Sequence, residues 1–218
     1  MKIVTMVAAL AVCTGFNAAS PTVSSAQAPP QANERASATT PSAVALKQDM
    51  RKLWTEHVVW TRDYIIAAVG DQPDATAAVN RLMKNQEDIG NAVATFYGAA
   101  AGQQLTTLLK EHITIAVDLI KAAKTGDKAG QQQADGRWQQ NAIQIAEFLS
   151  KANPHWSKGV LTDLMKKHLS TTTNEVVARL TKDWEADVRA FDEVYAHALH
   201  MADALSEGIV KQFPSKFT

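Results

Sequence analysis

The sequence predicts an all-α protein, and two observations support this fold class. Proline nearly disappears after residue 45, where only Pro73, Pro154 and Pro214 remain, each at an expected helix boundary. The same stretch is rich in Ala, Leu, Lys, Gln and Glu with apolar residues at helical spacing, and no part of it alternates as a strand would. We therefore expect one helical bundle domain over residues 45–218. Its six long antiparallel helices are predicted at about 45–69, 74–97, 101–125, 127–151, 157–181 and 183–212.

Several of these helices have a recognisable start signal. Asp74 follows Pro73 at the second helix, Asp127 precedes the fourth and Ser157 precedes the fifth. Short polar side chains are favoured there because they accept hydrogen bonds from the free backbone N–H groups of the first turn. The boundary near residue 182 has neither glycine nor proline. It depends on the alignment of Thr181-Lys-Asp183 with Thr125-Gly-Asp127.

A repeat of about 55 residues runs through the domain. Its first helices carry His57, His112 and His168 at equivalent positions. In its second helices Asn141 aligns with His197, and Asn85 begins the matching stretch. Each pair of helices would carry an apolar stripe that it cannot bury alone. We therefore expect three repeated αα-hairpins that pack on one another as an antiparallel bundle rather than as a curved solenoid.

The first 26 residues have the layout of a secretory signal peptide. Lys2 is the only charge, an apolar run spans residues 3–16, and small polar residues follow. The run is shorter than the roughly 20 apolar residues that a membrane span takes, so we expect no transmembrane segment. Cleavage near Ala26 would deliver the protein to the periplasm or the medium, and attachment of a lipid at Cys13 is the alternative. Residues 27–44, rich in Pro, Ala, Ser and Thr, are expected to form a disordered linker.

The charge balance and the cysteine count exclude several classes of function. The 218 residues include 22 Lys and Arg and 22 Asp and Glu, a balance that gives no general attraction to nucleic acid. The single cysteine excludes a disulfide framework within one chain and a cysteine-based zinc site. The sequence contains no zinc-protease motif, P-loop, dinucleotide-binding turn or nucleophile elbow. We therefore expect no enzymatic activity, and the sequence leaves the oligomeric state open.

Five short motifs are distributed along the domain: Glu56-His57-x-x-Trp60-Thr-Arg62, Asn85-x-x-Asp88-Ile-Gly-Asn91, Ala152-Asn-Pro154, Asp183-Trp184-x-Ala-Asp187 and Lys211-Gln-Phe-Pro-x-Lys-Phe217. In these motifs the chain resembles a family of uncharacterised exported bacterial helical proteins, over essentially all of residues 45–218. The resemblance implies an exported, all-helical protein. Members of that family often carry a glycosyltransferase label. We do not extend it to this chain, because the sequence has neither the α/β domain nor the metal-binding Asp-x-Asp that a nucleotide-sugar enzyme normally needs.

The helix histidines are the candidate functional residues. An imidazole that faces the interior of an apolar bundle needs a hydrogen bond, a charge partner or a metal ion. The run Glu193-x-x-x-His197-x-x-His200-x-x-Asp203 places four possible ligands on one helix face. His57, His112 or His168 would complete a metal site from other helices. Imidazole with carboxylate suits Fe, Zn or Cu, and a nearby thioether from Met165 or Met201 favours copper.

Two functional hypotheses follow. In the first, the protein is an exported binding protein that holds a metal ion, a metal-containing ligand or another small ligand through these histidines. Covalent haem is excluded because no Cys-x-x-Cys-His is present, whereas non-covalent haem between two histidines remains open. In the second, the protein is a structural or interaction protein of the cell envelope whose histidines only pack in the core. The tryptophans are expected to pack in the core, Arg62 and Asp63 to form either a buried cluster or a surface pair, and the tail from Lys211 to Phe217 to dock on the bundle.

Overall fold

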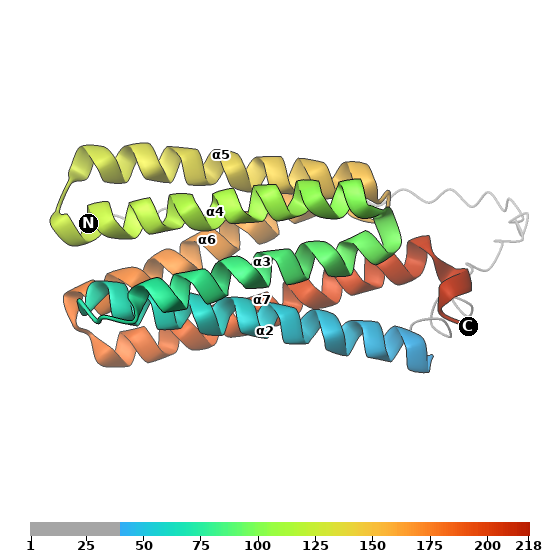
Figure 1. Ribbon diagram of the computed structural model, residues 1–218, viewed down its shortest axis with the longest axis horizontal. Coiled ribbons are helices and arrows are strands. Elements are labelled where there is room, and N and C mark those ends of the chain that lie inside the picture. Colours follow the sequence, from blue (N-terminus) through green and yellow to red (C-terminus); the bar gives the residue numbers. More distant parts are fainter. Residues whose placement is uncertain (1–39) are drawn as a thin grey trace, which may run out of the picture. The chain divides into compact units, whose positions relative to one another are not determined.

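The computed structural model describes residues 40–218, and all regular secondary structure in this part of the chain is helical (Figure 1). Its elements are α2 (Pro41–Val69), α3 (Ala75–Tyr97), α4 (Ala99–Thr125), α5 (Lys128–Ala152), α6 (Lys158–Thr181), α7 (Trp184–Gln212) and the 3-10 helix η1 (Pro214–Lys216). The predicted all-α fold is confirmed, while the threefold hairpin repeat stays a prediction. The predicted signal peptide, Cys13 and the linker as far as residue 39 lie outside the described residues. Within residues 40–218, no helix combines the length and the apolar character that crossing a membrane requires.

The helix boundaries agree with the predicted ones except at the start of α2. This helix begins at Pro41 rather than at residue 45, because Pro41 suits the first turn and the Thr40 hydroxyl accepts a hydrogen bond from the Ala43 N–H. The prediction of a linker up to residue 44 is therefore wrong for its last four residues. The boundary near residue 182 is confirmed. There Lys182 ends α6 in the left-handed conformation (φ 61°), and Asp183 caps α7 by accepting from the Ala186 N–H.

The six α-helices form a closed ring. Each helix packs against the helices that precede and follow it, and α7 packs against α2 (Figure 1). Short connections join successive helices, so neighbours in the ring run antiparallel. The helix α2 also contacts α4 and α6 across the interior. Side chains of α2, α4 and α6 can therefore meet inside the ring.

The helices α3 and α4 approach each other closely at Gly90 and Gly102. A Cβ atom added to Gly90 would lie 2.7 Å from the Gly102 carbonyl oxygen, and one added to Gly102 would lie 2.5 Å from the Gly90 carbonyl oxygen. Both obstacles are backbone atoms, which cannot rotate away. The two glycines are therefore required for this packing distance.

We expect Gly90→Ala to lower the free energy of unfolding by about 1–3 kcal/mol, because overpacking outweighs the better helix propensity of alanine. Gly136→Ala is the matched control: Gly136 lies in α5 with no heavy atom within 4 Å of an added Cβ. There alanine should stabilise the protein by about 0.5–1 kcal/mol. Urea unfolding of both variants measures the difference. Equal effects at the two positions would contradict the proposed close contact.

A buried ion cluster of four residues joins α2, α6 and α7. The Arg62 guanidinium donates to Glu175 Oε1 at 2.8 Å and to both carboxylate oxygens of Asp187 at 3.1 and 3.0 Å. Arg179 donates to Asp187 Oδ2 at 3.2 Å, and the Phe191 ring lies 4.6 Å from the Arg62 guanidinium carbon. Glu175 and Asp187 are almost completely buried. Of the two arrangements predicted for Arg62 and Asp63, the structure forms a buried cluster with Arg62, but Asp63 is exposed and takes no part in it.

The C-terminal segment docks on the bundle, as the sequence predicted. Phe217 is buried, and its ring stacks on Phe96 of α3 with the ring centres 5.9 Å apart. Phe213 contacts Phe96 and Tyr97, and the Lys216 ammonium lies over the Phe96 ring. This aromatic contact fixes the end of α7 against the end of α3.

Candidate functional site

Three equivalent hydrogen bonds between helices lie next to three histidines that face the interior of the ring: His57, His112 and His168. Asn85 of α3 donates to the Leu53 carbonyl at 3.0 Å, Asn141 of α5 to the Leu108 carbonyl at 3.1 Å, and His197 of α7 to the Leu164 carbonyl at 2.8 Å. Each acceptor lies one helical turn before His57, His112 or His168. These bonds occur at the positions that the sequence alignment pairs, and they support the predicted repeat. They also fix the position along the helix axis at which each histidine faces the interior.

The three interior histidines, His57, His112 and His168, meet inside the ring. The ring centre of His168 lies 5.6 Å from that of His57 and 5.9 Å from that of His112. His197 is stacked on His168 with 6.4 Å between the ring centres. The structure thus places His168 of α6 between histidines of α2, α4 and α7.

His112 has a hydrogen bond at each ring nitrogen. Its Nδ1 lies 2.8 Å from Asn141 Oδ1, and the indole N–H of Trp138 donates to its Nε2 at 3.0 Å. Since the indole can only donate, Nε2 is the acceptor and the proton is on Nδ1. His112 is therefore a neutral, fully bonded imidazole with no lone pair left for a metal ion.

His57 and His168 are bonded less completely. The Gln86 side-chain nitrogen lies 3.2 Å from His57 Nδ1, but it also donates to the Leu82 carbonyl and to Asn85 Oδ1. His168 Nδ1 is buried without a hydrogen-bond partner anywhere in residues 40–218. These two imidazoles, unlike His112, keep hydrogen-bonding capacity for a further group.

Burial keeps the interior histidines neutral. It lowers the pKa of His57 and that of His112 to about 4, and it lowers the pKa of His168 well below its ordinary value. The cause is the loss of hydration of the charged imidazolium in an apolar interior. His197 is only half-buried, and its pKa is lowered for the same reason. The site is thus uncharged at neutral pH.

A cavity opens between α5 and α6, and we call it the outer cavity. Its volume is about 310 Å³. Exposed residues of both helices line its mouth: Gln132, Asp135, Thr173 and Val177. Its walls are mostly apolar side chains of α4 and α6, with Tyr64 and Thr172, and its inner end is formed by the three interior histidines.

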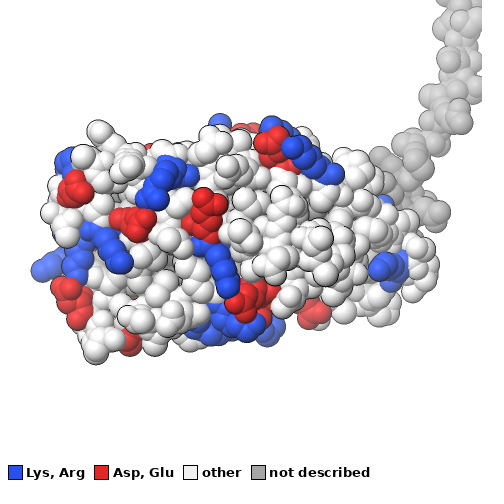
Figure 2. Space-filling model, turned by 45° about the horizontal axis from the view of Figure 1, so that its top comes forward, with Lys and Arg blue, Asp and Glu red and all other residues white. Residues whose placement is uncertain are grey.

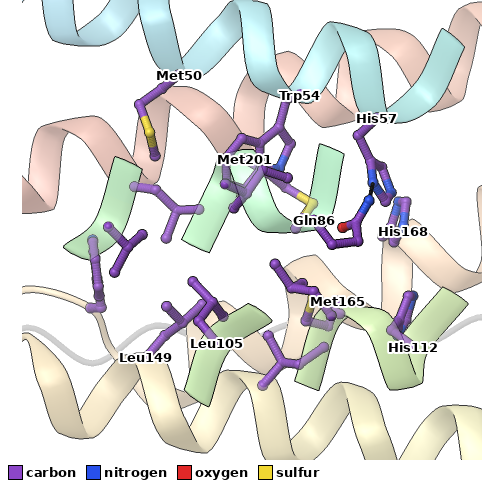
Figure 3. A pocket seen from close by; sticks show the side chains of 16 residues that line it. Met50, Trp54, His57, Gln86, Leu105, His112, Leu149, Met165, His168 and Met201 are labelled. Carbon is purple, nitrogen blue, oxygen red and sulfur yellow. Dashed lines mark hydrogen bonds between the residues drawn. The ribbon is translucent and has the colours of Figure 1, made fainter. Parts of the chain in front are cut away.

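A second, inner cavity has the same three histidines at one end (Figure 3). Its volume is about 60 Å³. Three methionines, two tryptophans and several aliphatic residues line it together with Gln86 and the interior histidines. No charged residue is among its lining residues.

Most of the unpaired buried polar atoms belong to side chains around these two cavities. Six buried side-chain nitrogen or oxygen atoms in residues 40–218 have no hydrogen-bond partner. Four of them belong to lining residues: Gln86 Oε1, Trp156 Nε1, His168 Nδ1 and Thr172 Oγ1. Each unpaired atom costs about 1–3 kcal/mol, which a bound molecule with suitable donors or acceptors would recover. The cavities are therefore the part of the described chain best suited to a ligand.

The structure separates the predicted metal ligands into two groups. His57, His112 and His168 are together in the interior, and His197 is beside them, but its Nε2 is bonded to the Leu164 carbonyl. Glu193 and His200 are exposed, and Asp203 is bound to Arg51 and Lys47 near the surface. The run from Glu193 to Asp203 therefore does not extend the interior group. Within residues 40–218, no three or more His, Cys, Asp and Glu side chains are placed to hold a metal ion together.

The sequence reasoning missed Gln86 and Thr172 as site residues. Gln86 is completely buried and contacts His57, and Thr172 lies one turn after His168 on the same face of α6. A polar residue within the inward stripe of a helix was the available signal, because it predicts a buried polar group that needs a partner.

The face drawn in Figure 2 offers no strong electrostatic signal for a partner. On the face drawn in Figure 2, acidic and basic side chains are interspersed, and part of that face is uncharged. Charged side chains also pair locally within residues 40–218, as Lys110 does with Glu87 and Arg137 with Asp118. The field on that face is therefore short-ranged, and the distinctive chemistry lies inside the ring.

Fold and site together define a six-helix ring with an internal, uncharged, histidine-lined cavity. No protein-family model, no curated protein and no solved structure matches the chain. The resemblance to exported helical proteins therefore stays a prediction from the sequence.

Proposed function

We propose that this is an exported binding protein that holds a small, uncharged, largely apolar molecule in the outer cavity. Export is inferred from the signal-peptide pattern of residues 1–26. The observation that carries the binding proposal is the cavity of about 310 Å³ that reaches the interior histidines, which is within the size range of small-molecule sites. The ligand is uncharged because the histidines are neutral and the only charged lining residue, Asp135, is at the mouth.

Two features favour a ligand that combines an apolar body with one polar group. The walls are mostly aliphatic, so they reward buried apolar surface. The inner end presents His57, His168 and the unpaired Thr172 hydroxyl, which can pair with a hydroxyl or carbonyl. A phenol-like molecule meets both requirements.

The test uses 2-naphthol and naphthalene as probes, and their binding is measured by calorimetry and by tryptophan fluorescence. We expect saturable binding of both, and Ala116→Phe, which fills the cavity wall, should abolish it. Ala100→Phe at an exposed position of α4 is the control and should leave binding unchanged. Thr172→Val should weaken the binding of 2-naphthol about 3–10-fold and leave the binding of naphthalene unchanged, because only the hydroxyl group of 2-naphthol loses a hydrogen bond. Thr114→Val, at an exposed position, should change neither.

Two results would refute the proposal. One is the absence of binding tighter than about 1 mM for either probe. The other is binding that persists in Ala116→Phe. Either result would favour the alternative of a structural or interaction protein whose histidines only pack in the core.

A further inference from the structure

The inner cavity concentrates the thioethers of the described chain. Residues 40–218 contain four methionines, and three of them, Met50, Met165 and Met201, line this one cavity. They come from α2, α6 and α7, three different helices. The remaining methionine, Met83, lies elsewhere on α3 and lines neither cavity.

Two of these thioethers lie near the interior histidines. Figure 3 shows Met165 and Met201 extending into the middle of the cavity from different helices, on the side where His57, His112 and His168 lie, whereas Met50 is at the far end. Met165 precedes His168 by three residues on the same face of α6, so the two side chains are neighbours. One thioether, one imidazole and a second thioether from α7 thus face one small space.

One imidazole of this group, that of His168, has a ring nitrogen that makes no hydrogen bond in the described chain and could bind a metal ion. His168 is buried, and its Nδ1 has no hydrogen-bond partner within residues 40–218. His112 is excluded as a ligand because Asn141 and Trp138 occupy its nitrogens.

The donor types select one kind of ion. Hard divalent cations such as Ca²⁺ and Mg²⁺ need several oxygen ligands, and no carboxylate lines the inner cavity. Thioether sulfur with neutral imidazole favours a soft ion, of which Cu(I) is the biological example. A single positive charge also costs less to bury than a double one, and the Trp54 and Trp156 rings that line the cavity can face it.

We propose that the inner cavity is a Cu(I) site formed by the thioethers of Met165 and Met201 and the imidazole of His168. Within residues 40–218, His, Cys, Asp and Glu side chains do not by themselves form a group that could hold a metal ion. In the proposed site the two thioethers provide the missing ligands. The proposal does not rest on the outer cavity, because only the histidines are common to the two sets of lining residues.

The test is an anaerobic titration of the purified protein with Cu(I) in competition with bicinchoninate, read by the absorbance of the chelator complex. We expect one Cu(I) per chain. Losing a direct ligand should cost at least the roughly 10–100-fold that loss of an outer-shell partner costs, so Met165→Leu and Met201→Leu should each weaken binding by that factor or more. Met83→Leu is the control and should bind as the parent protein does. X-ray absorption of the loaded protein should show sulfur scatterers that disappear in the double variant.

Leucine conserves the volume of methionine closely, so these variants should remain folded, and circular dichroism verifies this. The proposal is overturned if the protein takes no Cu(I) from bicinchoninate, or if the double variant binds it as tightly as Met83→Leu does. Retained 2-naphthol binding in the double variant would show that loss of copper does not reflect loss of the outer cavity.

Discussion

Lowering the pH from 7 to 5 is expected to destabilise the protein by about 3 kcal/mol, chiefly through the interior histidines. Each of these histidines is neutral in the folded state because its pKa is lowered to about 4 or well below its ordinary value, whereas in the unfolded chain it titrates near 6.5. Below pH 6.5 the unfolded state therefore binds more protons, and the free energy of unfolding falls until the folded pKa is reached. Between pH 6.5 and 5 each histidine contributes a loss of about 2 kcal/mol.

Glu175 opposes this trend. Burial raises its pKa to about 7, so between pH 7 and 4.5 the folded state binds the extra proton and gains stability as the pH falls. This gain is about 3 kcal/mol between pH 7 and 5, against a loss of about 6 kcal/mol from the three histidines. The histidines prevail because there are three of them, and the net loss is a large share of a typical stability of about 5–15 kcal/mol.

Two substitutions should shift the pH dependence in opposite directions. His168→Leu removes an imidazole whose Nδ1 has no partner, so it should cost little at pH 7 and reduce the loss between pH 7 and 5 to about 1 kcal/mol. Glu175→Gln keeps an acceptor for Arg62 but removes the titration, so the loss should rise to about 6 kcal/mol. His200→Gln, at an exposed position, is the control. Urea unfolding at several pH values measures all four proteins, and the same slope in all of them would contradict the assignment.

The helices could be predicted from the sequence because their signals are local. Asp127 and Asp183 each cap the helix that follows, and both residues were visible at the ends of apolar stripes. The predicted repeat placed His57, His112 and His168 at equivalent positions, but it left open whether they meet, and only the structure shows their rings close together. The start of α2 was misplaced because the composition around Pro41 resembles a linker, although proline is also a good first residue of a helix.

The sequence did not predict which helix faces point inward, nor which residues far apart in the chain come into contact. Residues at i, i+3 and i+4 share a helix face, but the spacing does not say which face is inward, and in α7 the buried stripe runs through Val194, Ala198 and Ala202. Glu193 and His200 are therefore outside the interior group. The contact of Arg62 with Asp187 joins residues that are 125 positions apart, and no local pattern in the sequence encodes such a partner.

Replacing Arg62 by methionine is expected to cost about 3–5 kcal/mol, which is the usual effect of removing one partner of a buried ion pair. The loss arises because Glu175 depends on Arg62 for its hydrogen bond, whereas Asp187 keeps Arg179. Methionine retains much of the aliphatic packing, so the missing charge and hydrogen bonds account for the effect. Arg189→Met is the control, because Arg189 and its partner Glu185 are both exposed, and such pairs contribute about 0–1 kcal/mol.

A second substitution distinguishes an unpaired charge from a general packing defect. If the cost of Arg62→Met comes from leaving the buried Glu175 carboxyl group without its cation, then Glu175→Gln in the same background should recover at least about 1 kcal/mol at pH 8. At that pH the carboxylate is ionised in the unfolded chain, so folding of Arg62→Met must bury an unpaired charge or take up a proton. The recovery should fade at pH 5, because Glu175 is then protonated and the two side chains become nearly equivalent. Chemical denaturation of the single and double variants at both pH values gives the coupling free energy. A coupling that is absent at pH 8 would show that Arg62 acts through packing against Phe191 rather than by neutralising the buried carboxylates.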